Sequence, residues 1–422
     1  MRGAEDGSRP LRQFAPALVL LSLAVLINYV DRGNLSIAAP LLKAELHIST
    51  SQLGILLSAF FWTYTILMFA AGRLADQFDV NLLIAAGLFL WTLATAVTGL
   101  VHGFAMLLAV RMMLGVGESV TFPACSKILA QNLTEQHRGF ANGMITAGLK
   151  AGPAVGTLGA GLLMAKYGWR PVFVGIGLAS LVWIPAWMYW RPRPELTGRM
   201  QTKCSVGFVD IMRKRSFWGT AAGNFCGNYV LYFFVIWLPY YLVTERHLTM
   251  VAMARMAGAF YMTDATSTVI TGWVADYWIR RGKTPTLVRK AAMAIGYATL
   301  AGCLIGCATA SSTSYIGWLF AIGISGGIAG SGTFAFSQTL AGREVAGQWT
   351  ALQNGLANFA GIVGPALTGF IVERTGHFMP AVMVAAAAAM MGGLAWVLVV
   401  GPVEPVNWIP SLELPVPAEE VA

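Results

Sequence analysis

The sequence predicts an all-α membrane protein with twelve transmembrane helices arranged as two pseudo-symmetric halves of six. Three observations lead to this fold class. Of the 422 residues, 56% are hydrophobic and only 11% are charged, whereas about a quarter of the residues of a soluble protein are charged. Apolar runs long enough to cross a bilayer recur along the chain, and short motifs of its first half return in its second half.

The apolar runs divide the chain into parts, because each is close to the roughly 20 residues that a helical span needs. In the first half they cover 14–38, 52–72, 80–101, 104–126, 139–165 and 170–190. In the second half they cover 216–243, 253–275, 288–310, 314–338, 347–372 and 378–401. We therefore expect an N-terminal six-helix half at 1–190, a linker at 191–215, a C-terminal six-helix half at 216–402 and a tail at 403–422.

The basic residues predict the orientation, since Lys and Arg concentrate on the cytoplasmic side of a membrane protein. With the N-terminus placed inside, 19 of the 28 Lys and Arg fall in inside segments, six fall outside and three lie within spans. We expect a multi-pass protein of the cell's inner membrane with its linker and both termini in the cytoplasm. The same distribution explains the net charge of +9 without a nucleic-acid partner.

Two motifs occur once in each half. The pattern Gly-x-x-Ala-Asp closes the second span at 72–76 and the eighth at 272–276, and Gly-Pro-Ala stands at 152–154 and at 364–366. Duplicated halves are typical of secondary transporters, whose substrate site lies near the midplane where the repeats meet. The sequence thus favours a transporter that works by alternating access.

Four longer motifs carry a family resemblance. They are Asn-Tyr-Val-Asp-Arg at 28–32, Arg-Met-Met-Leu-Gly-Val-Gly-Glu at 111–118, Trp-Leu-Pro-Tyr-Tyr at 237–241 and Trp-Thr-Ala-Leu-Gln-Asn at 349–354. From about residue 12 to 402 the chain resembles the major facilitator superfamily and, within it, the anion:cation symporter family. That family includes bacterial transporters of galactonate, glucarate and hexuronate. The resemblance implies a transporter and not an enzyme.

The resemblance also assigns gating or structural roles to the repeated acidic motif, at Gly72, Asp76, Asp276 and Arg280. Gln77 stands where the family usually has an Arg, so Asp76 must pair with another cation. Arg138 and Arg73 are the candidates.

Charged residues inside the spans mark the functional site, since an ionised group at mid-bilayer costs about 2.5–3.5 kcal/mol on insertion scales unless it faces a partner or water. Arg111 and Glu118 are seven residues apart, so on a helix they lie about 10 Å apart on nearly the same face. The formal charges in the spans sum to zero. The residues are Asp31, Arg32, Arg111, Glu118, Lys150 and Asp264.

This balance predicts coupling between a proton and an anion. With Asp31 and Glu118 ionised, the two arginines are neutralised and an anion gains little. Protonating either acid leaves a positive cavity that attracts a carboxylate, and linkage makes the effect reciprocal. The resemblance implies the same roles: Asp31 and Glu118 couple protons, Arg111 pairs with Asp31, and Arg32 binds the substrate carboxylate. These residues could instead form purely structural ion pairs.

Lys150 and Asp264 also reach mid-membrane. Lys150 lies in a region that we expect to be neutral in galactonate-type relatives. It could be a second substrate ligand, which would favour a dicarboxylate, or it could extend into a water-filled vestibule. Asp264 could have a supporting role only.

Neutral polar side chains within spans could recognise the hydroxyl groups of a sugar acid. Each of them could instead bond one helix to another. The candidates are Tyr29, Tyr64, Asn228, Tyr232, Gln353, Asn354 and Asn358.

We expect proton-coupled symport of an organic anion, preferably a sugar acid of the hexonate, hexuronate or glucarate type. An organic-anion exchanger or drug exporter on the same fold is the alternative. The chain has no metal-ligand cluster, nucleophile triad or nucleotide fingerprint, so we expect no cofactor besides the proton as coupling ion. The expected partners are the anion, protons and the lipid bilayer, and the expected state is a monomer.

Overall fold

The computed structural model describes residues 11–133, 135–192, 207–310, 314–406 and 408, and all its regular structure in these ranges is helical. The first half of the chain forms eight helices: α1 Leu11–Leu46, α2 Thr50–Gln77, α3 Val80–Thr98, α4 Phe104–Glu118, α5 Thr121–Asn132, α6 Glu135–Tyr167, α7 Trp169–Ser180 and α8 Trp183–Trp190.

The second half begins with a short helix in the part of the linker that is described, and a π-helical turn, η1, closes it. The elements are α9 Phe208–Met212, α10 Arg215–Thr244, α11 Met250–Arg280, α12 Pro285–Thr309, α13 Tyr315–Gly330, α14 Thr333–Thr375, α15 Met379–Leu394 and η1 Ala395–Val399.

Helix boundaries follow local capping signals. The backbone N–H of Gln52 donates to the Ser49 hydroxyl at 3.2 Å, and the Gln52 side chain accepts from the Ser49 backbone at 2.9 Å, which fixes the start of α2. Asp79 accepts from the N–H of Asn81 at 2.8 Å and begins α3 in the same way. Such caps satisfy N–H groups that have no partner within the helix.

The long helix α14 consists of two helices that meet at Gly342. This residue has φ +70°, a conformation that favours glycine. The Ser337 hydroxyl donates to the side-chain oxygen of Gln353 across the bend. These residues would stand about 24 Å apart along a straight helix, so the chain folds back between them. The first part of α14 completes the predicted span 314–338, and the second part forms the span 347–372.

All twelve predicted spans lie on helices; three of them are divided between two successive α-helices, and a fourth continues from α15 into η1. Within the described ranges, nine helical segments are long and apolar enough to cross a membrane by length and composition. Two others, α6 and α11, are long but more polar, and Lys150 and Asp264 are among their charged residues; α13 is shorter than a full span. The predicted all-helical membrane fold is confirmed.

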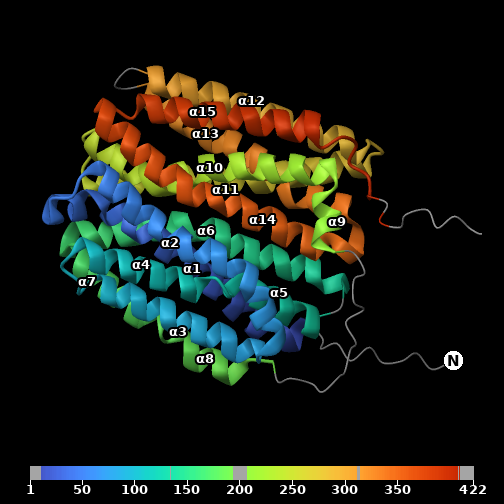
Figure 1. The fold of residues 1–422 in the computed structure, drawn as a ribbon, viewed down its shortest axis with the longest axis horizontal. Helices are drawn as coiled ribbons and strands as arrows, with labels where there is room; N and C mark the ends of the chain where they lie inside the picture. The colour runs from blue at the N-terminus through green and yellow to red at the C-terminus, as the bar shows by residue number, and fades with distance from the viewer. Residues whose placement is uncertain (1–10, 134, 193–206, 311–313, 407, 409–422) are drawn as a thin grey trace, which may run out of the picture.

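The helices form two bundles, α1–α8 and α10–α15, which lie side by side (Figure 1). Within the first bundle α1 packs on α6, and within the second α10 packs on α14. Between the bundles α2 packs on α14 and α6 on α11. The Gly-Pro-Ala repeats lie at two equivalent contacts, that of α6 with α1 and that of α14 with α10. A Cβ on Gly152 would lie 2.5 Å from the Cβ of Tyr29, and a Cβ on Gly364 would lie 3.5 Å from the ring of Tyr229.

Polar contacts join the two bundles at the end opposite α9. The Lys43 ammonium of α1 donates to Tyr240 of α10 at 2.8 Å and to Thr50 at 2.7 Å. Nearby, the backbone N–H of Ser51 donates to Glu373 of α14 at 2.6 Å. This end of the bundle interface is therefore closed by hydrogen bonds as well as by packing.

Candidate functional site

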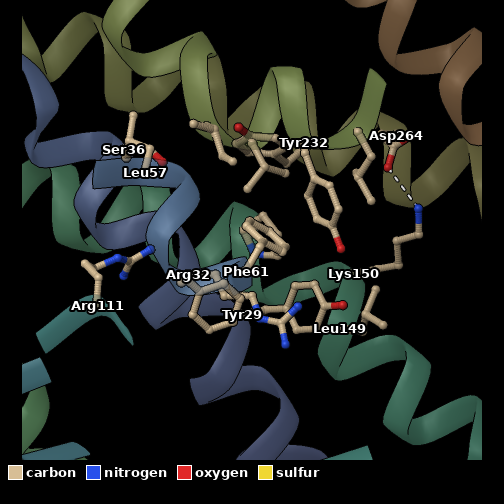
Figure 2. A pocket seen from close by; sticks show the side chains of 16 residues that line it. Tyr29, Arg32, Ser36, Leu57, Phe61, Arg111, Leu149, Lys150, Tyr232 and Asp264 are labelled. Carbon is tan, nitrogen blue, oxygen red and sulfur yellow. Dashed lines mark hydrogen bonds and ion pairs between the residues drawn. The ribbon is translucent and has the colours of Figure 1, made fainter. Parts of the chain in front are cut away.

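A cavity lies between the two bundles. Its wall is formed by α1, α2, α4 and α6 of the first bundle and by α10 and α11 of the second. The charged groups on its wall are three cations and one acid: Arg32, Arg111, Lys150 and Asp264 (Figure 2). Such a wall can bind an anion.

Arg32 forms the central ion pair of this site. Its Nε donates to Oε2 of Glu118 at 2.8 Å, and Glu118 is fully buried behind the cavity wall. The guanidinium carbon also lies 4.6, 5.0 and 4.4 Å from the ring centroids of Tyr29, Phe60 and Tyr64. Ring faces attract a guanidinium electrostatically, so Arg32 is held both by its charge partner and by stacking.

The helix geometry of α1 explains why only one member of its acid–base pair reaches the cavity. Consecutive residues on a helix point about 100° apart, while residues three or four apart share a face. Tyr29, Arg32 and Ser36 share the face that lines the cavity. Asp31 points elsewhere, where its Oδ1 accepts from Asn34 Nδ2 at 3.2 Å.

The family resemblance implies a salt bridge between Asp31 and Arg111, but the described residues do not form it. Asp31 Oδ2 and Arg111 Nε are both buried without a hydrogen-bond partner in that set. The Arg111 guanidinium lies 5.6 Å from the ring centroid of Phe60. Among the described residues the ion pair that forms is the one between Arg32 and Glu118.

Glu118 lies at an interruption of the fourth span. Helix α4 ends at Glu118 and α5 begins at Thr121. At this end of α4 the N–H of Ser119 donates to the carbonyl of Gly115 at 3.2 Å, and its hydroxyl donates to the carbonyl of Val116 at 2.8 Å. One of the two predicted proton-coupling acids thus lies where the span changes from one helix to the next.

Lys150 and Asp264 form a second ion pair, which connects the bundles. Lys150 Nζ of α6 lies 3.1 Å from Asp264 Oδ2 of α11, and both side chains are partly exposed. Figure 2 shows this pair on the side of the cavity away from Arg111. The mid-membrane position expected for both residues therefore brings them into one contact.

Among the neutral candidates, Tyr29 and Tyr232 line the cavity. The Tyr232 hydroxyl donates to Oδ1 of Asn358 at 2.6 Å, and Asn358 Nδ2 donates to the carbonyl of Asn354 at 2.8 Å. Asn358 therefore orients Tyr232 from behind the wall. Tyr64 likewise lies behind the wall, stacked on Phe60 with their centroids 5.0 Å apart.

Five predicted ligands are not among the residues that line the cavity: Tyr64, Asn228, Gln353, Asn354 and Asn358. For Gln353 the reason is clear, because it is fully buried and accepts a hydrogen bond from Ser337 across the bend of α14. Its amide joins two helices, which was the alternative reading of its position.

The sequence reasoning missed the aromatic lining. Phe60, Phe61 and Tyr261 line the cavity with the charged groups. Phe60 and Phe61 precede Tyr64 by four and three residues, so all three share one face of α2. That spacing was the available signal. The ring of Phe61 also lies 4.5 Å from that of Tyr232 across the bundle interface.

Most of the predicted gating motif lies outside the side chains that the structure describes, namely Gly72, Asp76, Arg138 and Asp276. The remaining member, Arg280, is exposed in the last turn of α11. In the described part of the chain, no three His, Cys, Asp or Glu residues group together in a way that could hold a metal ion.

Comparison with known proteins identifies the family. The model of the Major Facilitator Superfamily matches residues 21–365. The chain is 29% identical to a hexuronate transporter of Bacillus subtilis (strain 168), with 92% of this chain and 95% of that protein covered. It is 30% identical to a probable L-galactonate transporter of Escherichia coli (strain K12), with 93% and 90% covered. A probable galactarate/D-glucarate transporter of the same strain is 27% identical, with 92% and 94% covered.

Solved structures share the fold. A bacterial homolog of the human lysosomal transporter Spinster, in an inward-facing and occupied conformation, superposes with a TM-score of 0.75 at 18% identity. The alignment covers 93% of this chain and 95% of that one. The resemblance carried by the four sequence motifs is confirmed. The chain is a multi-pass membrane transporter, not an enzyme, and it belongs to the Major Facilitator Superfamily.

Proposed function

We propose that this transporter is a proton-coupled symporter of an organic anion, and that the anion is a sugar acid. Relatives that cover almost the whole chain are named for hexuronate, L-galactonate and galactarate or D-glucarate. Those names support the substrate class.

The observation that carries the proposal is the division of charge between the cavity wall and the layer behind it. Arg32 and Arg111 are on the wall. The acids Asp31 and Glu118 are buried behind it, at 1% and 0% exposure. A substrate therefore meets the cations directly, while the acids set the net charge that it experiences.

The proposed coupling follows from the cost of uncompensated charge in a low-dielectric site. When Asp31 and Glu118 are both ionised, they balance the two arginines. A proton on Asp31 leaves one positive charge in excess, and a substrate carboxylate can neutralise it. A guanidinium matches a carboxylate with two parallel hydrogen bonds. Arg111 and Arg32, whose Nη2 has no hydrogen-bond partner among the described residues, are therefore the proposed ligands.

Asp31 and Glu118 have different proposed roles. Glu118 already accepts a hydrogen bond from Arg32, so a proton there also releases Arg32 toward the substrate. Asp31 has one carboxylate oxygen without a hydrogen bond in the described set, so it can take a proton without breaking an ion pair. Asp31 is therefore the proposed first proton acceptor, and Glu118 links protonation to the substrate ligand.

The hydroxyl groups of a sugar acid need donors and acceptors on the cavity wall. The Tyr232 hydroxyl donates a hydrogen bond to Asn358, so its oxygen remains able to accept one from a substrate hydroxyl. Tyr29 lies on the same wall, beside Arg32. These two residues are the proposed contacts for the polyhydroxylated body.

We propose that the protein lies in the inner membrane of the cell, with both termini and α9 on the cytoplasmic side. The bias of Lys and Arg toward that side supports it. In this orientation, the hydrogen bonds of Lys43 and Ser51 close the outer end of the transporter. The proposed working unit is a monomer.

Transport by the purified full chain in proteoliposomes tests the proposal. Radiolabelled hexuronate and galactonate are offered with and without an inward proton gradient. We expect accumulation above equilibrium only with the gradient, and its loss when a protonophore is added. Uptake that is indifferent to the gradient would refute proton coupling, and uptake that requires a second anion inside would indicate an exchanger.

A further inference from the structure

The second ion pair in the cavity has no part in the coupling described above. Lys150 and Asp264 are both on the cavity wall. Their charged atoms are 3.1 Å apart, with 26% and 19% of the side chains exposed. They remain accessible from the cavity although they are paired. They lie on the side away from Arg111 (Figure 2), where the far end of a bound sugar acid would lie if its carboxylate were at the arginines.

The pair sets the charge at this end of the cavity to zero. A second carboxylate arriving here would be attracted by Lys150 and repelled by Asp264, and it would also lose its hydration. Juxtaposed like charges cost several kcal/mol and are a common way to reject a wrong ligand. A neutral hydroxyl meets no such opposition, because it can accept from the ammonium and donate to the carboxylate.

We propose that Asp264 is a specificity-determining residue, which neutralises Lys150 and thereby makes the cavity prefer sugar acids with one carboxylate over those with two. This inference rests on the proposed transport of sugar acids. It reverses the expectation from sequence that a lysine at position 150 favours a dicarboxylate. The lysine alone would favour one, but its partner on α11 removes the charge that a second carboxylate needs.

A matched pair of substrates tests the preference for one carboxylate over two. D-gluconate and D-glucarate differ only at the sixth carbon, which carries a hydroxyl in the first and a carboxylate in the second. Each is used to compete for counterflow of radiolabelled galactonate in proteoliposomes at equal pH on both sides, so that proton driving force does not enter. The ratio of the two half-inhibitory concentrations reports the preference.

For the unaltered chain we expect gluconate to compete at a concentration about tenfold lower than glucarate, a difference of about 1.4 kcal/mol. In Asp264→Asn the amide keeps the size and hydrogen bonding of the side chain, while Lys150 gains a full uncompensated charge. The ratio of half-inhibitory concentrations should then shift by roughly tenfold in favour of glucarate. The double variant Lys150→Gln with Asp264→Asn is neutral again, so its ratio should return to the original preference.

Asp210→Asn is the matched control. It removes the carboxylate of Asp210 in α9, which forms an exposed pair with Arg213 outside the cavity, and it should leave the ratio unchanged. A glucarate preference in the unaltered chain would overturn the inference, and so would an unchanged ratio in Asp264→Asn. If no sugar acid competes with or exchanges for any other in the unaltered chain, the proposed function itself fails, which is a distinct result.

Discussion

Glu118, at the interruption between α4 and α5, accepts a 2.8 Å hydrogen bond from Arg32 in the middle of α1, and of the two only Arg32 is on the cavity wall. The acid is therefore shielded from the cavity by its own base. Any change in the charge of Glu118 reaches a substrate through the position and charge of Arg32.

Removing only one member of the Arg32–Glu118 pair should strongly destabilise the folded protein. Removing one member of a buried ion pair costs about 3–5 kcal/mol, because the other charge is left without compensation. Arg32→Ala and Glu118→Ala should each lower the melting temperature in detergent. The double variant Arg32→Met with Glu118→Leu should melt closer to the original chain than either single variant does. Single variants that melt like the unaltered protein would show that the pair is not formed.

Arg111 should behave differently, because it has no described salt bridge to lose. Arg111→Gln should weaken the binding of a sugar acid about tenfold or more, since a guanidinium–carboxylate pair is a strong charge-assisted interaction. Its effect on stability without substrate should be smaller than that of Arg32→Ala. Thermal shift of each variant with and without gluconate separates the two effects. A loss of stability with intact binding would assign Arg111 a structural role.

The sequence was sufficient to predict the fold because long apolar runs have few alternatives in a membrane. The Gly-Pro-Ala repeats lie at corresponding places in the two halves: Gly152 faces Tyr29 at a distance that leaves no room for a Cβ, and Gly364 faces the ring of Tyr229 at ordinary contact distance. These features depend on composition and local spacing, which a single sequence contains.

The pairing of charges could not be predicted in the same way. Each residue turns the side chain about 100° around a helix, so a small rotation of α1 decides whether Asp31 or Arg32 faces α4. The partner of Lys150 lies on α11, more than a hundred residues away. The position of Gln353 was also out of reach, because its contact with Ser337 exists only through the bend at Gly342.

The contact between Lys43 and Tyr240 should bias the transporter toward closure at the end opposite α9. A hydrogen bond to a charged group contributes about 1.5–3 kcal/mol, so Lys43→Met should increase the population that is open at this end. Spin labels on Gln52→Cys and Arg374→Cys report the separation of α2 and α14 there, and we expect a longer distance distribution.

Lys166→Met is the control for this measurement. Its ammonium lies 5.1 Å from the ring centroid of Tyr167, within the same bundle, so the labels should show no change. Identical distributions in Lys43→Met and in the chain with Lys43 intact would contradict a latching role for the contact.

The central claim is that the anion and the proton cross together. The most direct measurement is the internal pH of proteoliposomes, followed with a trapped fluorescent indicator after a sugar acid is added without any imposed pH gradient. We predict saturable acidification with the unaltered chain, and with Asp31→Asn we predict exchange of labelled anion without acidification. Uptake of labelled sugar acid by the unaltered chain with no change of internal pH would contradict the account.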